Sequence, residues 1–254
     1  MATVPLATRT RLSASLLGAV LCMTAQGVQA ACQTIPFQDR PYTICEVSAG
    51  ADLRLFQTAP DGGVMGSFAR IDTTLKSEGK TLDFAMNAGM YHPDRTPVGL
   101  LVENGVARAP LITAKGPGNF GLLPNGVFCI GPDRFAVLES RKYQVQAPQC
   151  RHATQSGPML VIDGALHPRF IPDSDSRYIR NGVGVSADGM TAYLAISGQP
   201  VNFTEFALLF RDRLKAPNAL YFDGKISRLY APDLGRNDFG FQMGPMVGLV
   251  VPAP

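Results

Sequence analysis

Polar side chains and glycines gather in several short segments, each beside an apolar stretch. In the first, Met86–His92, the side chains of Asn87, Tyr91 and His92 can hydrogen-bond to a sugar or a phosphate. Gly89 in the same segment allows the backbone to turn tightly or to approach a ligand. An ordinary Asn/Gly turn with Tyr91 packed below it explains these residues equally well, so the segment alone does not define a site.

Two further segments could recognise an anion. Backbone N–H groups around Ser156 and Gly157 could form an anion-binding nest, although a turn before a buried strand is the alternative. The Gly-x-Ser-x-Gly motif is absent there, which argues against a nucleophilic Ser156. Arg180 precedes an apolar strand, and its guanidinium suits bidentate phosphate recognition. A surface salt bridge from Arg180 to Asp173 or Asp175 is the competing interpretation.

A carboxylate stands at the end of the apolar segment Ala219–Phe222. Asp223 follows that segment directly, so it is expected at the rim of a sheet, where a catalytic or ligand-binding carboxylate would fit. The pair Asp223-Gly224 is also a turn signal, and a hairpin to a strand over Ile226–Tyr230 explains it equally well.

The order of these segments along the chain resembles the phosphodiester glycosidase family, most closely a compact, exported bacterial branch. The matching motifs are Asn87–Tyr91, Ser156–Val161 with Asp163-Gly164, Arg180–Val185, Thr204–Ala207 and Leu220–Gly224, and the resemblance covers roughly Leu82 to Val250. The family's last motif typically continues into further glycines and a Ser or Thr pair, whereas this chain reads Lys225-Ile226-Ser227. Because of this departure, the family's substrates are a weaker guide to the substrate of this chain. The expected class of reaction is unchanged.

The resemblance implies an exported hydrolase that cleaves the glycosidic bond of a sugar-1-phosphodiester. Ordinary glycosidases use two carboxylates, one of them an acid. A phosphate leaving group is already acidic, so we expect one carboxylate and a cationic or backbone clamp for its charge. Asp223 would act as general base or stabilise the oxocarbenium-like centre. Arg180, aided by N–H groups near Gly157, would hold the phosphate, while Asn87 and Tyr91 bind the sugar or orient water.

The remaining expected site residues are substrate-binding. They are Gly89, His92, Ser156, Gly224 and Ser227. Glu205 also falls in a family motif, but a helix capping box explains it. The sequence has no His-x-x-His or Glu-x-x-His ligand cluster, so no cofactor is certain. A calcium or magnesium ion held by Asp223 and carbonyl groups stays an open alternative.

Two other functions fit the same segments. One is a non-catalytic module that binds envelope glycans, which the altered motif after Asp223 favours. The other is a phosphodiesterase that cuts the P–O bond. The net charge of +3 comes without a Lys/Arg cluster or aromatic-basic interleaving, so nucleic acid is not expected as a partner. The sequence does not indicate the oligomeric state.

The elements that must position these residues are mostly short strands. Strands are expected at Tyr42–Val47, Leu53–Gln57, Leu82–Met86, Val98–Glu103, Val106–Arg108, Gly126–Ile130, Phe135–Glu139, Met159–Ile162, Gly182–Ser186, Thr191–Ile196, Ala219–Phe222, Ile226–Tyr230 and Val247–Val251. Asn104-Gly105 and Asp188-Gly189 are hairpin signals between them. Helices are expected at about 67–77, with Gly79 as the stop, and at 202–214, with a capping box of Asn202 and Glu205. The predicted class is α+β with mainly antiparallel sheet in a single domain.

The N-terminus predicts export. Arg9 and Arg11 precede the apolar stretch Leu12–Met23, and Val28-Gln29-Ala30 resembles a signal-peptide cleavage site. We therefore expect a signal peptide over residues 1–30, a mature domain over 31–254, and a periplasmic or secreted location. Lipidation at Cys32 is the alternative, and no later segment is long and apolar enough to cross a bilayer.

The cysteines are also typical of an exported chain. Of five, Cys22 would leave with the signal peptide, and the remaining even set implies two disulfides. Sequential pairing, Cys32–Cys45 and Cys129–Cys150, closes short loops and is preferred among the three possible pairings.

Overall fold

The structure is a computed structural model that describes residues 1–3, 31–223 and 225–254. The expected signal peptide lies, from residue 4 onward, outside the described residues, and so does Gly224.

In the described part of the chain the strands form three antiparallel sheets. The first has the order β1-β2-β13-β12-β14-β10-β11, with bounds β1 Ala31–Phe37, β2 Arg40–Ser48, β13 Thr191–Ser197, β12 Asn181–Val185, β14 Asn218–Asp223, β10 Met159–Ile162 and β11 Ala165–Leu166. The second has the order β16-β15-β4-β17-β3, with β16 Arg236–Asn237, β15 Leu229–Ala231, β4 Lys80–Asn87, β17 Met246–Pro252 and β3 Leu53–Phe56. The third has the order β6-β5-β9-β7-β8, with β6 Val106–Ala109, β5 Leu101–Glu103, β9 His152–Ser156, β7 Gly126–Ile130 and β8 Phe135–Glu139. The predicted α+β class with mainly antiparallel sheet is confirmed.

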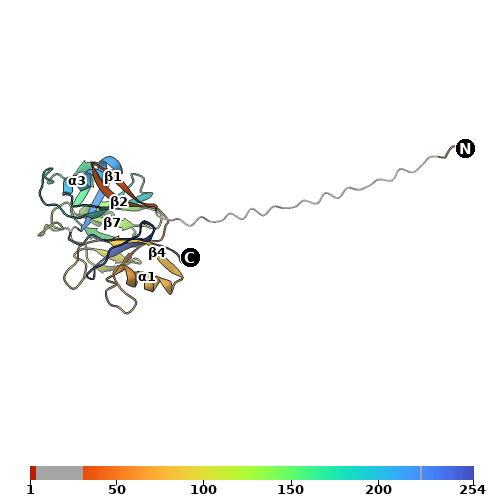
Figure 1. Cartoon of the computed structure of the whole chain (residues 1–254), viewed down its shortest axis with the longest axis horizontal. Helices are drawn as coiled ribbons and strands as arrows, with labels where there is room; N and C mark the ends of the chain where they lie inside the picture. The colour runs from red at the N-terminus through yellow and green to blue at the C-terminus, as the bar shows by residue number, and fades with distance from the viewer. Residues whose placement is uncertain (4–30, 224) are drawn as a thin grey trace.

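All three sheets contribute to one hydrophobic core. Phe222 of β14, Phe84 of β4 and Phe128 of β7 are buried in the same cluster. The rings of Phe128 and Phe222 lie 6.4 Å apart. In Figure 1 the strands β1, β2, β7 and β4 succeed one another between the helices α3 and α1 at opposite ends of the molecule. The sheets therefore pack on one another and fix the relative positions of their strand ends.

Both predicted helices are present. Helix α1 spans Phe68–Lys76 and is capped by Ser67, and Gly79 follows it with a φ of +67°. Helix α3 spans Phe203–Leu208, has the expected capping box of Asn202 and Glu205, and continues as a π-helical segment, η1, over Leu209–Arg213. A short helix α2 over Ser140–Gln146 and a 3₁₀ turn η2 over Pro232–Leu234 were not predicted.

Most predicted strands agree with the structure to within a few residues, and one prediction needs correction. The strand expected over Ile226–Tyr230 begins only at Leu229, as β15. It pairs with β4 of the second sheet, while β14 belongs to the first. A hairpin from Asp223 is therefore wrong: the chain crosses from one sheet to another there.

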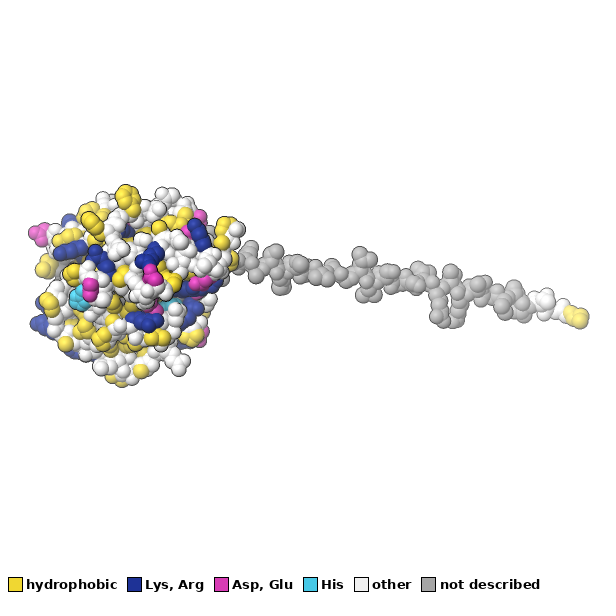
Figure 2. Space-filling view, turned by 90° about the horizontal axis from the view of Figure 1, so that it is seen from below, with side chains coloured by type: hydrophobic (Ala, Val, Ile, Leu, Met, Phe, Trp, Pro, Cys, Tyr) yellow, Lys and Arg dark blue, Asp and Glu magenta, His cyan; other side chains and the backbone are white. Residues whose placement is uncertain are grey.

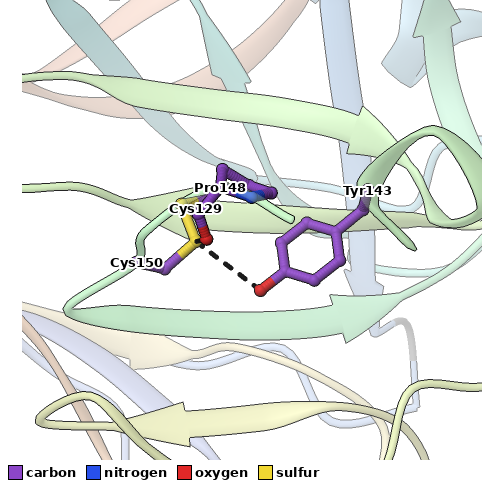
Figure 3. Close-up of a disulfide and its surroundings, with 4 residues drawn as sticks. All are labelled: Cys129, Tyr143, Pro148 and Cys150. Atoms are coloured by element: carbon purple, nitrogen blue, oxygen red, sulfur yellow. Dashed lines mark hydrogen bonds between the residues drawn. A yellow bond between two sulfur atoms is a disulfide. The ribbon is translucent and has the colours of Figure 1, made fainter. Parts of the chain in front are cut away.

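Both disulfides pair as predicted. Cys32 and Cys45 face each other across the β1–β2 ladder. Cys129 of β7 joins Cys150, and Figure 3 shows the Tyr143 ring beside this bond, with its hydroxyl 3.6 Å from Sγ of Cys150. The second bond ties the segment that follows α2 to the third sheet.

Charged side chains are dispersed over the surface. On the face in Figure 2, Lys and Arg alternate with Asp, Glu and apolar side chains instead of gathering in one patch. Among the described residues, no helix has the length and apolar character needed to cross a membrane.

Candidate active site

A cavity of about 690 Å³ opens where the first two sheets meet loops of the third. Its lining includes Asp223, Tyr91 and His92, three of the residues predicted for the site. The other lining residues are Met90, Val98, Pro117, Gly118, Asn119, Phe120, Ser176, Tyr178, Tyr221, Lys225 and Ile226. Residues distant in sequence thus converge on a space large enough for a small ligand.

Asp223 is the last residue of β14, at the edge of the cavity. In the strand ladder it lies opposite Asn181, and its backbone N–H donates to Oδ1 of Asn181 at 3.3 Å. Its carboxylate Oδ1 accepts from the backbone N–H of Lys225 at 3.0 Å. The carboxylate is therefore held at the point where the chain leaves the first sheet.

Asn87 and Asn181 form a reciprocal amide pair in the interior. Both are fully buried, and each Nδ2 lies 3.2 Å from the other's Oδ1. Nδ2 of Asn181 also donates to the carbonyl of Asn87 at 2.6 Å. Because Asn87 ends β4 and Asn181 begins β12, the pair joins the second sheet to the first beneath Asp223.

The same two amides hold the segment between Asp223 and β15. Asn87 donates to the carbonyl of Ile226, and its Oδ1 accepts from the backbone N–H of Arg228 at 2.9 Å. Ser227 donates from Oγ to the carbonyl of Asp223 at 2.8 Å. Asn87 and Ser227 thus act on the loop that carries Asp223 and are not among the residues lining the cavity.

Tyr91 brings a phenol to the cavity near Asp223. Burial raises the pKa of Tyr91, and the negative charge of Asp223 raises it further. Tyr91 packs so closely on Gly244 that a Cβ at that position would lie 2.5 Å from the Tyr91 Cβ and 2.6 Å from Cγ of its ring. The phenol therefore stays protonated at neutral pH and can donate a hydrogen bond into the cavity.

Arg180 lies behind the cavity wall. Only 1% of the residue is exposed, and its guanidinium carbon lies 3.8 Å from the centre of the Phe203 ring and 5.3 and 5.4 Å from those of Tyr221 and Tyr178. Nε donates to the carbonyl of Val201 and Nη2 to that of Ser176, each at 2.8 Å. Burial lowers the pKa of Arg180.

No carboxylate pairs with Arg180 among the described residues. The surface salt bridge to Asp173 or Asp175 is therefore wrong, and Nη1 is buried without a hydrogen-bond partner in the described part of the chain. The pair that does form in this region is Arg177 with Glu205, at 2.6 Å. Tyr178 and Tyr221, whose rings lie near the Arg180 guanidinium, line the cavity, whereas Arg180 does not.

Three other predicted residues support the site from within the protein. Ser156 is fully buried and donates from Oγ to the carbonyl of Phe222 at 2.8 Å, so its hydroxyl fixes β14 just before Asp223. Gly157 packs against Asn125, where an added Cβ would lie 2.7 Å from the Asn125 side chain. Gly89 approaches Thr154 in the same way. None of the three is among the residues lining the cavity.

Sequence reasoning missed part of the cavity wall. Tyr178 and Tyr221 flanked predicted residues but were given no role, and Asn181 stood inside a quoted motif without one. The segment Pro117–Phe120 belongs to the loop between β6 and β7, and its only signal was a glycine-rich composition. Its contact with the cavity depends on how the third sheet packs on the first.

The side chains that line the cavity include few groups that could coordinate a metal ion. Among the described residues, no group of three or more His, Cys, Asp or Glu side chains could hold one. Asp223 is the only carboxylate among the residues that line the cavity. A cation would therefore have to use Asp223 together with carbonyl oxygens or water.

Comparison with known proteins defines the class of protein. A family model for phosphodiester glycosidases matches residues 80–242, which hold the cavity's strand ends and the loop that carries Asp223. The chain therefore belongs to the phosphodiester glycosidase family, a class of hydrolases.

Two other proteins are similar to this chain. The chain is 34% identical over 178 residues to the uncharacterized protein YigE of Escherichia coli (strain K12), covering 70% of this chain and 69% of that protein. Its fold is similar to the catalytic domain of zebrafish N-acetylglucosamine-1-phosphodiester alpha-N-acetylglucosaminidase, auto-inhibited by its pro-peptide. That match has a TM-score of 0.55 and 14% identity over 89% of this chain and 84% of the other, so it establishes the fold.

Proposed function

We propose that this protein hydrolyses the glycosidic C–O bond of a sugar-1-phosphodiester in the cavity beside Asp223. The observation that carries the proposal is a single carboxylate, Asp223, at the rim of a cavity walled by Tyr91, Tyr178 and Tyr221, in a chain of the phosphodiester glycosidase family. Tyrosine rings offer apolar faces and hydroxyl groups, which suit a sugar ring.

In the proposed reaction a water oxygen forms a bond to the anomeric carbon while the bond from that carbon to the phosphate oxygen breaks. Asp223 accepts the proton of the attacking water, or stabilises the positive charge that develops at the anomeric carbon. The leaving group departs as a phosphate monoester anion and requires no protonation. The phenol of Tyr91, close to Asp223, orients the water or the sugar.

Arg180 supplies positive charge for the phosphate from behind the wall. A buried cation without an anionic partner is unfavourable, and a bound anion would offset that cost. Ser176, which accepts from Arg180, lines the cavity, and so do Tyr178 and Tyr221, two of the three rings around Arg180. The phosphate is therefore proposed to bind against this wall. The N–H groups near Gly157 have no part in this proposal, because Gly157 is not among the residues that line the cavity.

The substrate test uses N-acetylglucosamine-1-phosphodiesters first, because that sugar is named for the zebrafish protein of similar fold. We expect Asp223→Asn to lower kcat at least about 100-fold. We expect Arg180→Lys to raise KM as well, since a lysine cannot keep both carbonyl contacts and the stack on Phe203. Asp133→Asn, at an exposed aspartate, is the matched control and should leave both constants unchanged. Wild-type rates in a folded Asp223→Asn protein would overturn the proposal.

Hydrolysis in water labelled with oxygen-18 shows whether the sugar C–O bond or the P–O bond breaks. Label in the released sugar supports cleavage of the C–O bond. Label in the phosphate would instead identify a phosphodiesterase. Tight binding of the diester without any turnover would favour the glycan-binding module, which the Lys225-Ile226 departure motivates. Dialysis against a chelator, followed by calcium or magnesium, tests whether a cation at Asp223 is required.

We propose that the protein is exported and acts in the periplasm or outside the cell. The two disulfides support this, since such bonds persist in oxidising compartments. Cell fractionation and N-terminal sequencing of the mature protein provide the test. A mature chain that begins near Ala31 is expected, and an intact Met1 on the cellular protein would argue against export.

A further inference from the structure

Two phenylalanines stand almost fully exposed on one short loop. Phe239 is 94% exposed and Phe241 83% exposed, and Gly240 separates them. Phenylalanine is normally buried, and neighbouring exposed apolar side chains mark a contact surface. The fold gives these rings no role, since they belong to none of the buried clusters.

The loop is fixed to the segment that follows Asp223. Nη1 of Arg228 donates to the carbonyl of Phe241 at 2.6 Å. Gly240 lies so close to the Arg228 guanidinium that a Cβ there would overlap it. Asp238 accepts from the backbone N–H of Leu229 at 2.9 Å. The exposed rings are therefore carried by a loop anchored at both of its flanks.

This anchoring places the loop beside the cavity. The backbone N–H of Arg228 is bound by Asn87, whose amide also holds Ile226 of the cavity lining. Beyond the loop, Gly244 touches the ring of Tyr91. Ile226 and Tyr91 both pack against the buried cluster that contains Met243. The loop is thus joined through Arg228 to the segment that contains Ile226 of the cavity lining.

A cation and an apolar side chain stand next to each other at the same place. Lys225 and Ile226 follow shortly after Asp223, and both line the cavity. A lysine ammonium can pair with a phosphate, and an isoleucine offers apolar contact just beyond it. A cation followed by apolar side chains matches a phosphate that carries an apolar ester.

We propose that Ile226, Phe239 and Phe241 form a subsite for an apolar aglycone, so that the substrate is a sugar-1-phosphodiester whose second ester is a lipid-like alkyl chain. This inference rests on the proposed function and names its substrate class. A second sugar as aglycone would require hydrogen-bonding groups, and Phe239 and Phe241 provide none from their side chains. Covering these rings with an alkyl chain removes apolar surface from water on both partners.

The test compares two substrates that differ only in the aglycone. N-acetylglucosamine-1-phosphate esterified with methyl or with n-decyl is hydrolysed at concentrations below micelle formation, and binding of both is measured by calorimetry. For the wild type we expect kcat/KM and affinity to be at least about tenfold higher for the decyl ester, which corresponds to burying about two methylene groups. Phe239→Ser combined with Phe241→Ser should remove this preference and leave the methyl ester unaffected.

The double variant should fold, because both rings are exposed. Val145→Ser, at an apolar residue 86% exposed on α2, is the matched control and should keep the preference. Equal constants for the two esters, or a preference that survives the double variant, would overturn the inference. If the double variant no longer binds phosphatidylglycerol vesicles but keeps the preference for the decyl ester, the two rings contact a membrane and the inference is overturned.

The binding data keep the two proposals separate. If neither ester is hydrolysed but the decyl ester binds more tightly through Phe239 and Phe241, the aglycone subsite stands and the hydrolytic function fails. If both esters are hydrolysed with equal constants, the hydrolytic function stands and the aglycone subsite fails.

Discussion

At the scale of single residues, the site depends on buried amides as much as on the half-buried carboxylate of Asp223. Asn87 was expected to touch the sugar or water, but the structure gives its side chain contacts inside the protein. Its partner Asn181 accepts from the backbone of Asp223 and from the Ser227 hydroxyl. The proposed catalytic position is thus set by an amide pair that binds backbone from two sheets.

We predict that Asn181→Ala lowers activity more than it lowers stability. The substitution removes the hydrogen bonds of Asn181 to the buried side chain and carbonyl of Asn87, which should cost on the order of 2 kcal/mol in the free energy of unfolding. It also releases the backbone of Asp223, so kcat should fall at least about tenfold at temperatures where the variant remains folded. Urea unfolding and steady-state kinetics measure the two effects separately.

Asn202→Ala is the matched control for this prediction. Asn202 is also fully buried, but it caps α3, and its side chain bonds Glu205, Pro172 and Ser174 instead of the Asp223 loop. Its loss should cost about 1 kcal/mol of stability and leave kcat unchanged. Equal effects of the two substitutions on kcat would contradict a positioning role for Asn181.

At the scale of elements, local sequence pattern identified the apolar strands and missed a polar one. Strands β7, β8 and β10 match their predicted bounds because they are short apolar runs. Strand β9, His152–Ser156, was missed because it contains polar residues, yet all five are buried. Gln155 donates to Ser140 and accepts from the N–H of Leu100, and Thr154 donates to the carbonyl of Ala88. Such partners come from tertiary packing, so no local pattern reveals them.

The same limit applies to the candidate site. The sequence placed Asp223 correctly at a strand end, because an apolar run stops there. It could not show that the chain then crosses to a second sheet, since β15 pairs with β4 more than 100 positions earlier in the chain. It also could not show that Arg180 lies under aromatic rings, because Phe203 belongs to a different element.

We predict that the disulfide of Cys129 and Cys150 stabilises the fold by about 3 kcal/mol. The bond closes a loop with a sequence separation of 21, and its removal increases the entropy of the unfolded chain. Replacing both cysteines by alanine should lower the urea midpoint without changing kcat, because neither residue lines the cavity. Replacing Cys32 and Cys45 in the same way is the comparison, with a similar loss expected for its separation of 13. An unchanged midpoint in both variants would contradict the prediction.

At the scale of the whole molecule, two buried histidines, His152 and His167, should make stability depend on pH, because burial lowers the pKa of both and more strongly that of His152. His152 on β9 is 1% exposed, and its Nδ1 accepts from the backbone N–H of Asn104 at 3.3 Å. Burial, helped by the positive charges of Arg151 and Arg54 and opposed by the negative charge of Asp52, lowers the pKa of His152 to about 4. The folded protein therefore keeps this ring neutral at pH values where the unfolded chain protonates it.

We predict that the neutral His152 ring makes its full contribution to stability above about pH 6.5. The free energy of unfolding should then decrease as the pH falls toward 4. With a pKa near 6.5 in the unfolded chain and about 4 in the folded state, His152 alone should cost about 2 kcal/mol at pH 5 relative to pH 7. The carboxylate of Asp52, whose pKa the Arg54 hydrogen bond lowers to about 2, loses its contribution only below about pH 4.

His152→Asn keeps an acceptor for Asn104 but cannot protonate, so its urea midpoint should vary less between pH 7 and pH 5 than that of the wild type. His92→Asn, at an exposed histidine, should retain the wild-type pH dependence. The same slope in the His152 variant and the wild type would show that another group controls acid stability.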